Sequence, residues 1–351
     1  MTNRLKETAR LFVSRLLVRS GITAVSRTLL PKQGAHIFYG HRVTHDDEGY
    51  LQGLSPKWFD EQLTYLTRHY EVIPLTDLVR CLEDRRPVPK GSVVLTFDDG
   101  FRDNLENAWP ILEKYHVTAT IFLVTGSVTS GELPWSQRLG VMFQKSSEPI
   151  LRHAISGPEP MDLSSDPARK RSYDVIKRGM MTMDRDDRER GLVDLEQALG
   201  VNPPRDRMLS WKDAEYLKSR GIEIGAHTYT HPYLARISNA AATWEMERSR
   251  DDLRRQLGIE RPVFCFPAGS LTPQLVDTAR RLGFRGSFMP SPMNRVNTLE
   301  TVDPFSMRRT GLPNGPAVQL EAELDGPLPS LRQMYRFAGR PFRRSPENGG
   351  A

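Results

Sequence analysis

The chain has 351 residues, 38% of them hydrophobic and 26% charged, and a formal net charge of +6. This length and composition suit one large globular α/β domain with insertions or two small domains, and the two cysteines, Cys81 and Cys265, exclude a disulfide framework. No stretch approaches the ~20 apolar residues of a membrane-spanning helix and no secretory signal is evident, so we expect a cytoplasmic protein or one peripheral to the inner membrane.

Residues 1–33 are expected to form a basic amphipathic helix. Apolar side chains fall on one helical face, and the arginines lie largely elsewhere. These apolar residues are Leu5, Ala9, Phe12, Leu16 and Leu17. The helix can lie on an anionic membrane surface or pack against its own domain, and the sequence leaves both readings open.

The main domain is expected over residues 34–320, where strand-like and helix-like segments alternate. The segment 34–43 reads as a strand that ends near His41, and the run VVLTF at residues 93–97 suits a strand buried on both faces. Further strands are expected at 117–124, 222–225, 262–266, 284–288 and 305–309. This alternation predicts a parallel barrel or a doubly wound sheet.

Two segments differ from this pattern. Residues of about 130–208 are helical in pattern and densely charged, which predicts a helical insertion that forms a rim or lid. Residues 321–351 are rich in Pro, Gly and Arg, and we expect a basic and partly disordered tail.

Polar residues that carry chemistry follow two of the predicted strands. Asp98 and Asp99 come directly after the strand at 93–97, and His227 and His231 follow the strand at 222–225. The carboxyl ends of parallel strands meet at one rim of the sheet, which is where ligands bind. One carboxylate and two imidazoles suit zinc or another divalent transition metal, with a position left open for water or substrate.

Three motifs in order resemble those of polysaccharide deacetylases, the NodB-like carbohydrate esterase family 4. They are TFDDG at 96–100, HTYTH at 227–231 and FPAG at 266–269, and the similarity covers roughly residues 34–124 and 208–310. The resemblance implies a distorted parallel (β/α) barrel. It also implies a divalent metal, with Zn²⁺ expected and Co²⁺ or Ni²⁺ as alternatives, and hydrolysis of acetyl groups on sugars.

The resemblance also implies roles for individual residues. Asp98 corresponds to the catalytic base, and Asp99, His227 and His231 correspond to the metal ligands. The backbone N–H of Ala268 corresponds to the donor that stabilises the tetrahedral oxyanion.

The sequence departs from the family pattern at two places. Cys265 stands where many members have an arginine that orients the base, and Arg309 resembles the late arginine of the exopolysaccharide and biofilm branch, with Arg308 beside it as the alternative. No histidine follows His231 to act as a late general acid. His41 resembles the early histidine of the branch with a permuted motif order, so we expect His41 to protonate the leaving amine.

These observations predict a metal-dependent deacetylase that acts on N-acetylated sugars of a cell-surface polysaccharide or of its lipid-linked precursor. The alternative is a catalytically inactive carbohydrate-binding member of the same fold. The basic ends also suit a nucleic-acid binder, but the chain lacks clustered basic and aromatic stacking motifs, so we expect no nucleic-acid partner.

Overall fold

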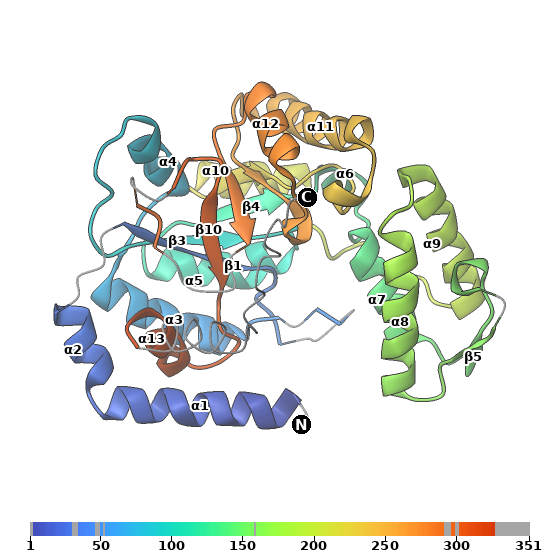
Figure 1. Ribbon diagram of the computed structural model, residues 1–351, viewed down its shortest axis with the longest axis horizontal. Helices are drawn as coiled ribbons and strands as arrows, with labels where there is room; N and C mark the ends of the chain where they lie inside the picture. The colour runs from blue at the N-terminus through green and yellow to red at the C-terminus, as the bar shows by residue number, and fades with distance from the viewer. Residues whose placement is uncertain are drawn as a thin grey trace, which may run out of the picture.

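Short parallel strands form a closed barrel at the centre of the molecule (Figure 1). The computed structural model describes residues 3–29, 34–45, 50–51, 53–157, 159–290, 296–298 and 302–326. Within these ranges the order is β1-β10-β9-β8-β7-β4-β3, and β3 pairs in turn with β1, so seven strands close into a ring. The predicted fold class, a distorted parallel (β/α) barrel with a helical insertion, is confirmed.

The strands of the barrel are β1 (Ala35–Gly40), β3 (Ser92–Phe97), β4 (Thr120–Leu123), β7 (Glu223–Ala226), β8 (Phe264–Cys265), β9 (Ser287–Pro290) and β10 (Met307–Gly311). A short strand, β2 (Glu71–Val72), pairs with the start of β3. The ring is uneven: β1 and β3 pair along six residues each, whereas β7 and β8 share one pair, Ala226 with Phe264.

Alternate residues of the barrel strands belong to two different clusters of buried hydrophobic residues. In β3, Val93, Leu95 and Phe97 belong to the cluster that packs against the surrounding helices, whereas Val94 belongs to a second cluster with Phe122 and other strand residues. Because side chains alternate across a strand, Val94, Thr96 and Asp98 share the second face.

The helices around the barrel are α3 (Pro56–His69), α4 (Leu75–Glu83), α5 (Trp109–Lys114), α10 (Trp211–Ser219), α11 (Asn239–Leu257), α12 (Pro273–Arg281) and α13 (Ala317–Leu324). A single π-helical turn, η1 (Asn104–Ala108), leads into α5, and two 3₁₀ turns, η3 (Leu234–Arg236) and η4 (Pro267–Gly269), follow β7 and β8. None of the described helices is long and apolar enough to cross a bilayer.

Helix α4 packs at the amino ends of the strands. Glu223, the first residue of β7, accepts hydrogen bonds from the backbone N–H of Leu75 at 2.8 Å and of Thr76 at 3.1 Å, both in the first turn of α4. A carboxylate at a helix N-terminus satisfies unpaired N–H groups and complements the helix dipole. The amino ends are therefore covered, and the carboxyl ends are left for the polar residues.

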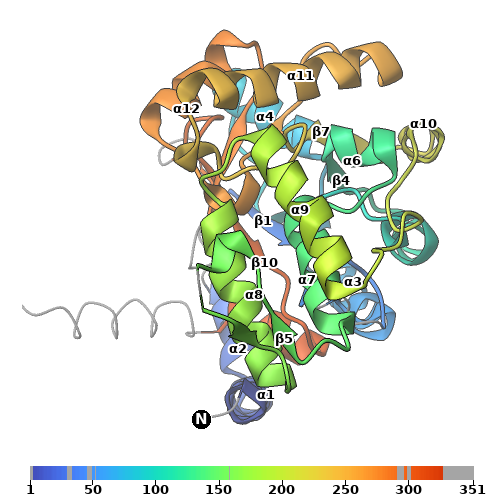
Figure 2. The same cartoon turned by 90° about the vertical axis from the view of Figure 1, so that its right-hand side faces the viewer.

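The chain between β4 and α10 forms the helical insertion. It contains α6 (Thr125–Ser130), α7 (Trp135–Lys145), α8 (Asp166–Met180), α9 (Arg185–Leu199), a 3₁₀ turn η2 (Ala154–Ser156) and a two-stranded hairpin of β5 (Ile150–Leu151) and β6 (Met161–Asp162). Helices α7, α8 and α9 stand beside the barrel and face the viewer in Figure 2. They enclose their own apolar core, which includes Leu139, Phe143, Ile176 and Leu195.

The N-terminal segment forms two helices, α1 (Asn3–Arg19) and α2 (Ile22–Leu29), where one helix was predicted. The break falls at Ser20 and Gly21, and Gly21 has a φ of 75°. Helix α1 runs along α13, at the lower edge of the molecule in Figure 1.

Other sequence expectations differ from the structure in detail. Helices α6 and α13 were not predicted, and α13 runs across the domain boundary expected at residue 320. The rest of the predicted tail, from residue 327, lies outside the described residues.

Candidate functional site

A pocket of about 280 Å³ opens where the carboxyl ends of the strands meet. His41 follows β1, Asp98 and Asp99 follow β3, and His227 follows β7. Cys265 is the last residue of β8, and Arg309 lies in β10. All of these residues line the pocket, together with His231 and Ala268. The two polar sequence segments thus meet at one rim, as the strand ends predicted.

Asp99, His227 and His231 converge in one part of this pocket, which we call the Asp99 half. The Nε2 atoms of His227 and His231 lie 3.4 and 3.3 Å from Oδ1 of Asp99. This Oδ1 atom is buried and has no hydrogen-bond partner among the described residues. A buried carboxylate oxygen between two imidazole nitrogens fits a divalent cation, which these three side chains would hold.

The protonation states in the Asp99 half suit metal ligation. Burial lowers the pKa of His227 to about 4 and that of His231 well below its ordinary value, so both imidazoles are neutral near pH 7. Nδ1 of His227 lies 2.7 Å from the carbonyl oxygen of Cys265, which leaves Nε2 to face Asp99. Burial, and next the charge of Asp98, raise the pKa of Asp99 well above its ordinary value, a cost that a bound cation would offset.

The loop that carries the two histidines is held from three directions. Glu245 in α11 accepts hydrogen bonds from the backbone N–H of Tyr229 at 2.9 Å and of Thr230 at 2.7 Å. Gly126 at the start of α6 donates to the Tyr229 carbonyl at 2.9 Å, and a Cβ there would lie 2.5 Å from that oxygen. From the insertion, Trp135 Nε1 donates to the His231 carbonyl at 2.8 Å.

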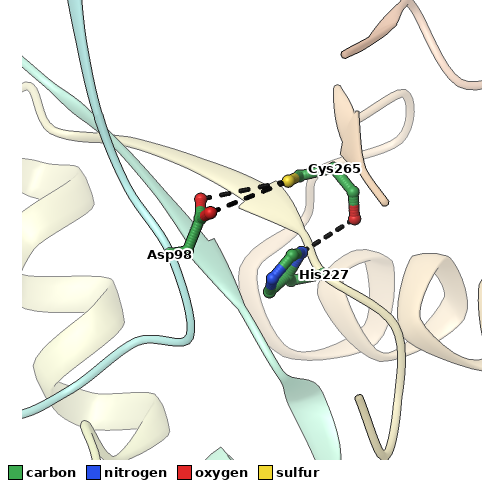
Figure 3. A group of neighbouring side chains, drawn as sticks. All are labelled: Asp98, His227 and Cys265. Atoms are coloured by element: carbon green, nitrogen blue, oxygen red, sulfur yellow. Dashed lines mark hydrogen bonds between the residues drawn. The ribbon is translucent and has the colours of Figure 1, made fainter. Parts of the chain in front are cut away.

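Asp98, Arg309 and Cys265 form the neighbouring part of the pocket, which we call the Asp98 half. The Arg309 guanidinium donates to Oδ1 of Asp98 at 2.7 Å and to Oδ2 at 2.5 Å. Its Nη2 atom also lies 2.7 Å from the Cys265 sulfur. Figure 3 shows the Asp98 carboxylate and the Cys265 thiol pointing toward each other, with a hydrogen bond between His227 and the Cys265 carbonyl. The Cys265 sulfur lies 3.9 Å from Oδ1 of Asp98.

The electrostatics of the Asp98 half favour an ionised carboxylate. Burial alone would raise the pKa of Asp98, but the Arg309 guanidinium outweighs burial and holds this pKa below its ordinary range. Burial raises the pKa of Cys265 well above its ordinary value, so its sulfur is a protonated thiol. Arg309, not Arg308, is the residue that pairs with Asp98, and it also contacts the Cys265 sulfur.

The backbone around the pocket is strained. Asp99, Thr228, His231 and Ala268 have φ angles of 74°, 67°, 60° and 49°. These four are among seven non-glycine residues of the described chain with positive φ. Each such conformation costs on the order of 1–3 kcal/mol and persists only where the surrounding contacts impose it.

His41 and Ala268 both lie in the pocket, as predicted from the resemblance. Burial lowers the pKa of His41, while the charge of Asp98 acts in the opposite direction. Ala268 sits in the 3₁₀ turn after β8. The roles expected for the His41 side chain and the Ala268 backbone N–H remain predictions.

The insertion contributes polar residues that sequence reasoning missed. Ser136, Gln137 and Lys177 line the same pocket from α7 and α8. Lys177 is half-buried, forms no ion pair with any described residue, and has its ammonium 5.5 Å from the centre of the Tyr173 ring. Burial lowers its pKa, and its charge contributes to the low pKa of His231. Lys177 therefore places a positive charge beside the Asp99 half.

Comparison with known proteins identifies similar sequences and folds. A profile of the family described as polysaccharide deacetylase matches residues 85–287, more than half of the chain. The chain is 34% identical over 73 residues to the poly-beta-1,6-N-acetyl-D-glucosamine N-deacetylase of Staphylococcus epidermidis, a match that covers 20% of this chain and 25% of that protein. A second relative, YxkH of Bacillus subtilis, is 32% identical over 113 residues, or 32% of each chain. The chain thus spans about a third or less of these relatives' length.

Solved structures with low sequence identity share the fold. The deacetylase PplD of Streptococcus pyogenes, solved in complex with acetate, has a TM-score of 0.54 and 20% identity, covering 84% of this chain and 99% of that chain. IcaB from Ammonifex degensii has a TM-score of 0.53 and 19% identity, covering 84% of this chain and 98% of that chain.

Proposed function

The chain belongs to the polysaccharide deacetylase family, and from this premise we propose that it is a metal-dependent hydrolase of N-acetylated sugars. Its substrate would be a cell-surface polysaccharide or the lipid-linked precursor of one, and its products acetate and a free amine. The observation that carries the proposal is the convergence of Asp99, His227 and His231 beside the ionised Asp98 in one pocket.

Asp99, His227 and His231 would hold the divalent metal. When bound, the metal supplies Lewis-acid polarisation of the acetyl carbonyl and lowers the pKa of water. The buried, unpartnered Oδ1 of Asp99 and the neutral imidazoles meet the requirements of such a site. Zinc is the expected ion, with cobalt or nickel as alternatives, because this ligand set accepts each of them.

The other pocket residues would move and orient protons. Asp98, kept ionised by Arg309, accepts the proton of the attacking water as general base. His41 donates a proton to the leaving amine, and the backbone N–H of Ala268 donates to the developing oxyanion. Arg309 acts through Asp98, because its two hydrogen bonds fix the orientation of the carboxylate.

The relatives suggest the class of sugar. The staphylococcal relative is named as an N-deacetylase of poly-beta-1,6-N-acetyl-D-glucosamine. An N-acetylglucosamine unit in a polymer or precursor is therefore the first substrate to test, with an amide rather than an ester as the bond that is hydrolysed.

The test is acetate release from N-acetylglucosamine oligomers by the purified chain, with zinc, cobalt or nickel added in turn. We expect release in at least one metal, and a loss of about 10²–10⁴-fold in the Asp98→Asn variant. No release from any acetylated amino-sugar oligomer, together with no effect of Asp98→Asn, would contradict the proposal.

A catalytically inactive carbohydrate-binding protein is the second candidate. The observation that favours it is Cys265, which stands where the family often has an arginine. The guanidinium of Arg309 beside Asp98 argues against it. Calorimetric titration with the oligomers, combined with the acetate assay, distinguishes the two candidate functions. An inactive carbohydrate-binding protein would bind the oligomers but release no acetate at any metal concentration.

A further inference from the structure

The N-terminal helices α1 and α2 turn polar side chains toward the rest of the molecule. Arg10 donates to Glu323 at 2.8 Å, Thr23 donates to Glu321 at 2.8 Å, and Arg27 donates to Asp325 at 3.0 Å. These acidic residues lie in α13 or directly after it. Ion pairs and hydrogen bonds therefore help to attach the two helices to the domain.

The outward face of the same helices is apolar. Phe12 is 69% exposed and Leu16 is 60% exposed, and they lie one turn apart in α1. Val13 in α1 and Ile22 and Val25 in α2 are also exposed. Five of the ten large exposed hydrophobic residues of the described chain thus fall within residues 12–25. An amphipathic helix of a soluble domain normally shows the opposite orientation.

Positive charge accompanies this apolar face. Arg15 and Arg19 are exposed in α1, and neither forms an ion pair with a described residue. In Figure 1, α1 lies along the outer edge of the molecule, with α13 on its inner side. Its outer side is therefore not covered by the rest of the described chain.

We propose that the apolar and basic face of α1 and α2, formed by Phe12, Val13, Arg15, Leu16, Arg19, Ile22 and Val25, docks on an anionic lipid bilayer. Apolar side chains of such a helix enter the boundary between headgroups and acyl chains, and arginines attract anionic headgroups. A second copy of this chain is a poorer occupant, because the same arginines would face each other across a twofold contact. This inference concerns a surface outside the catalytic pocket and stands apart from the proposed deacetylation.

The test is sedimentation of the full chain with vesicles of phosphatidylcholine alone, or mixed with phosphatidylglycerol. We expect binding to the mixed vesicles that weakens as salt is added. The double variant Phe12→Ser and Leu16→Ser should lose about tenfold or more in binding. The double variant Arg15→Glu and Arg19→Glu should lose about 25-fold or more, since each arginine near an anionic surface contributes about fivefold.

Control variants come from the insertion, where exposed side chains of the same kinds lie on another surface. Val175→Ser with Val193→Ser removes two exposed apolar residues of α8 and α9, and Arg190→Glu with Arg205→Glu reverses two exposed charges. These variants should bind the mixed vesicles within about twofold of the unmodified chain.

Equal binding to both kinds of vesicle, or equal binding by all variants, would overturn the proposal. So would a dimer in sedimentation velocity that Phe12→Ser with Leu16→Ser dissociates while vesicle binding is unchanged, because the face would then serve a second copy. Acetate release from a soluble oligomer should be the same in all variants, so this measurement reports separately on the proposed enzyme activity.

Discussion

Asp98 and Asp99 are adjacent in sequence, yet the two buried carboxylates are surrounded by different groups in the two halves of the pocket. In the Asp98 half, a resident guanidinium forms two hydrogen bonds to the carboxylate and keeps it charged. In the Asp99 half, two neutral histidines surround a carboxylate oxygen that has no hydrogen-bond partner among the described residues. The first half is complete within the chain, whereas the divalent metal that we propose would complete the second.

The largest effect on either half is expected from removing one of the proposed metal ligands in the Asp99 half. We expect His227→Ala and Asp99→Ala each to abolish stoichiometric binding of a divalent metal and to reduce acetate release to background, because two donors remain. Elemental analysis of the purified variants measures the metal, and the exposed His45→Ala is the matched control. Full metal occupancy in His227→Ala would place the ion elsewhere.

Removing the partner of Asp98 should lower the free energy of unfolding of the protein. Arg309→Met leaves a buried carboxylate without its partner, which we expect to cost about 3–5 kcal/mol of unfolding free energy. The double variant Asp98→Asn with Arg309→Met should lose less than the sum of the two single variants, since no buried charge remains unpaired. Denaturant unfolding measures these values, and Arg308→Met, on the same strand, should be nearly neutral. Additive losses would show that the pair is not coupled.

The loop that carries His227 and His231 can be perturbed without substituting a proposed metal ligand. Glu245→Ala removes the acceptor that holds the Tyr229 and Thr230 N–H groups, and we expect metal affinity to fall by about 10–100-fold. Glu247→Ala, on the exposed side of the same helix, should leave affinity unchanged. Competition with a chromogenic chelator gives both dissociation constants, and equal affinities would mean that the loop holds its shape without Glu245.

The smallest effect is expected at the insertion. Lys177→Met removes a positive charge beside the Asp99 half, so metal affinity should rise by about two- to fivefold. If Lys177 also contacts the substrate, KM should rise by a similar factor while kcat stays constant. Lys170→Met on the same helix, where the lysine pairs with Asp174, is the control. A fall in metal affinity would contradict the electrostatic argument.

Strand-end residues were the part of the site that the sequence could predict. Asp98, Asp99 and His227 directly follow strands, and parallel strands direct their carboxyl ends to one rim, so their convergence required no knowledge of distant packing. Arg309 was predicted only through the family resemblance. The hydrogen bonds between Arg309 and Asp98 depend on the pairing of β10 with β1, which no local pattern encodes.

Residues on helices were the part that sequence reasoning missed. Glu245 lies in a charge-rich helix where nothing distinguishes it from exposed neighbours such as Glu247. Lys177 lies in a helix of the insertion, outside the strands of the barrel whose ends define the rim. Helix α13 was missed because its sequence has no strong amphipathic pattern; contacts with α1 and α3 hold it in place. Likewise, α1 and α2 were expected as one helix, although Gly21 marks the break.

The left-handed backbone at Asp99 restricts how this protein can change during evolution. Aspartate and asparagine tolerate a φ near 74° better than longer or branched side chains do, and only aspartate adds a carboxylate. A glutamate would supply the same charge with the wrong backbone preference, and a glycine would relax the backbone but lose the donor. If Asp99 holds the proposed metal, the backbone angle and the carboxylate together leave few residues that could replace it.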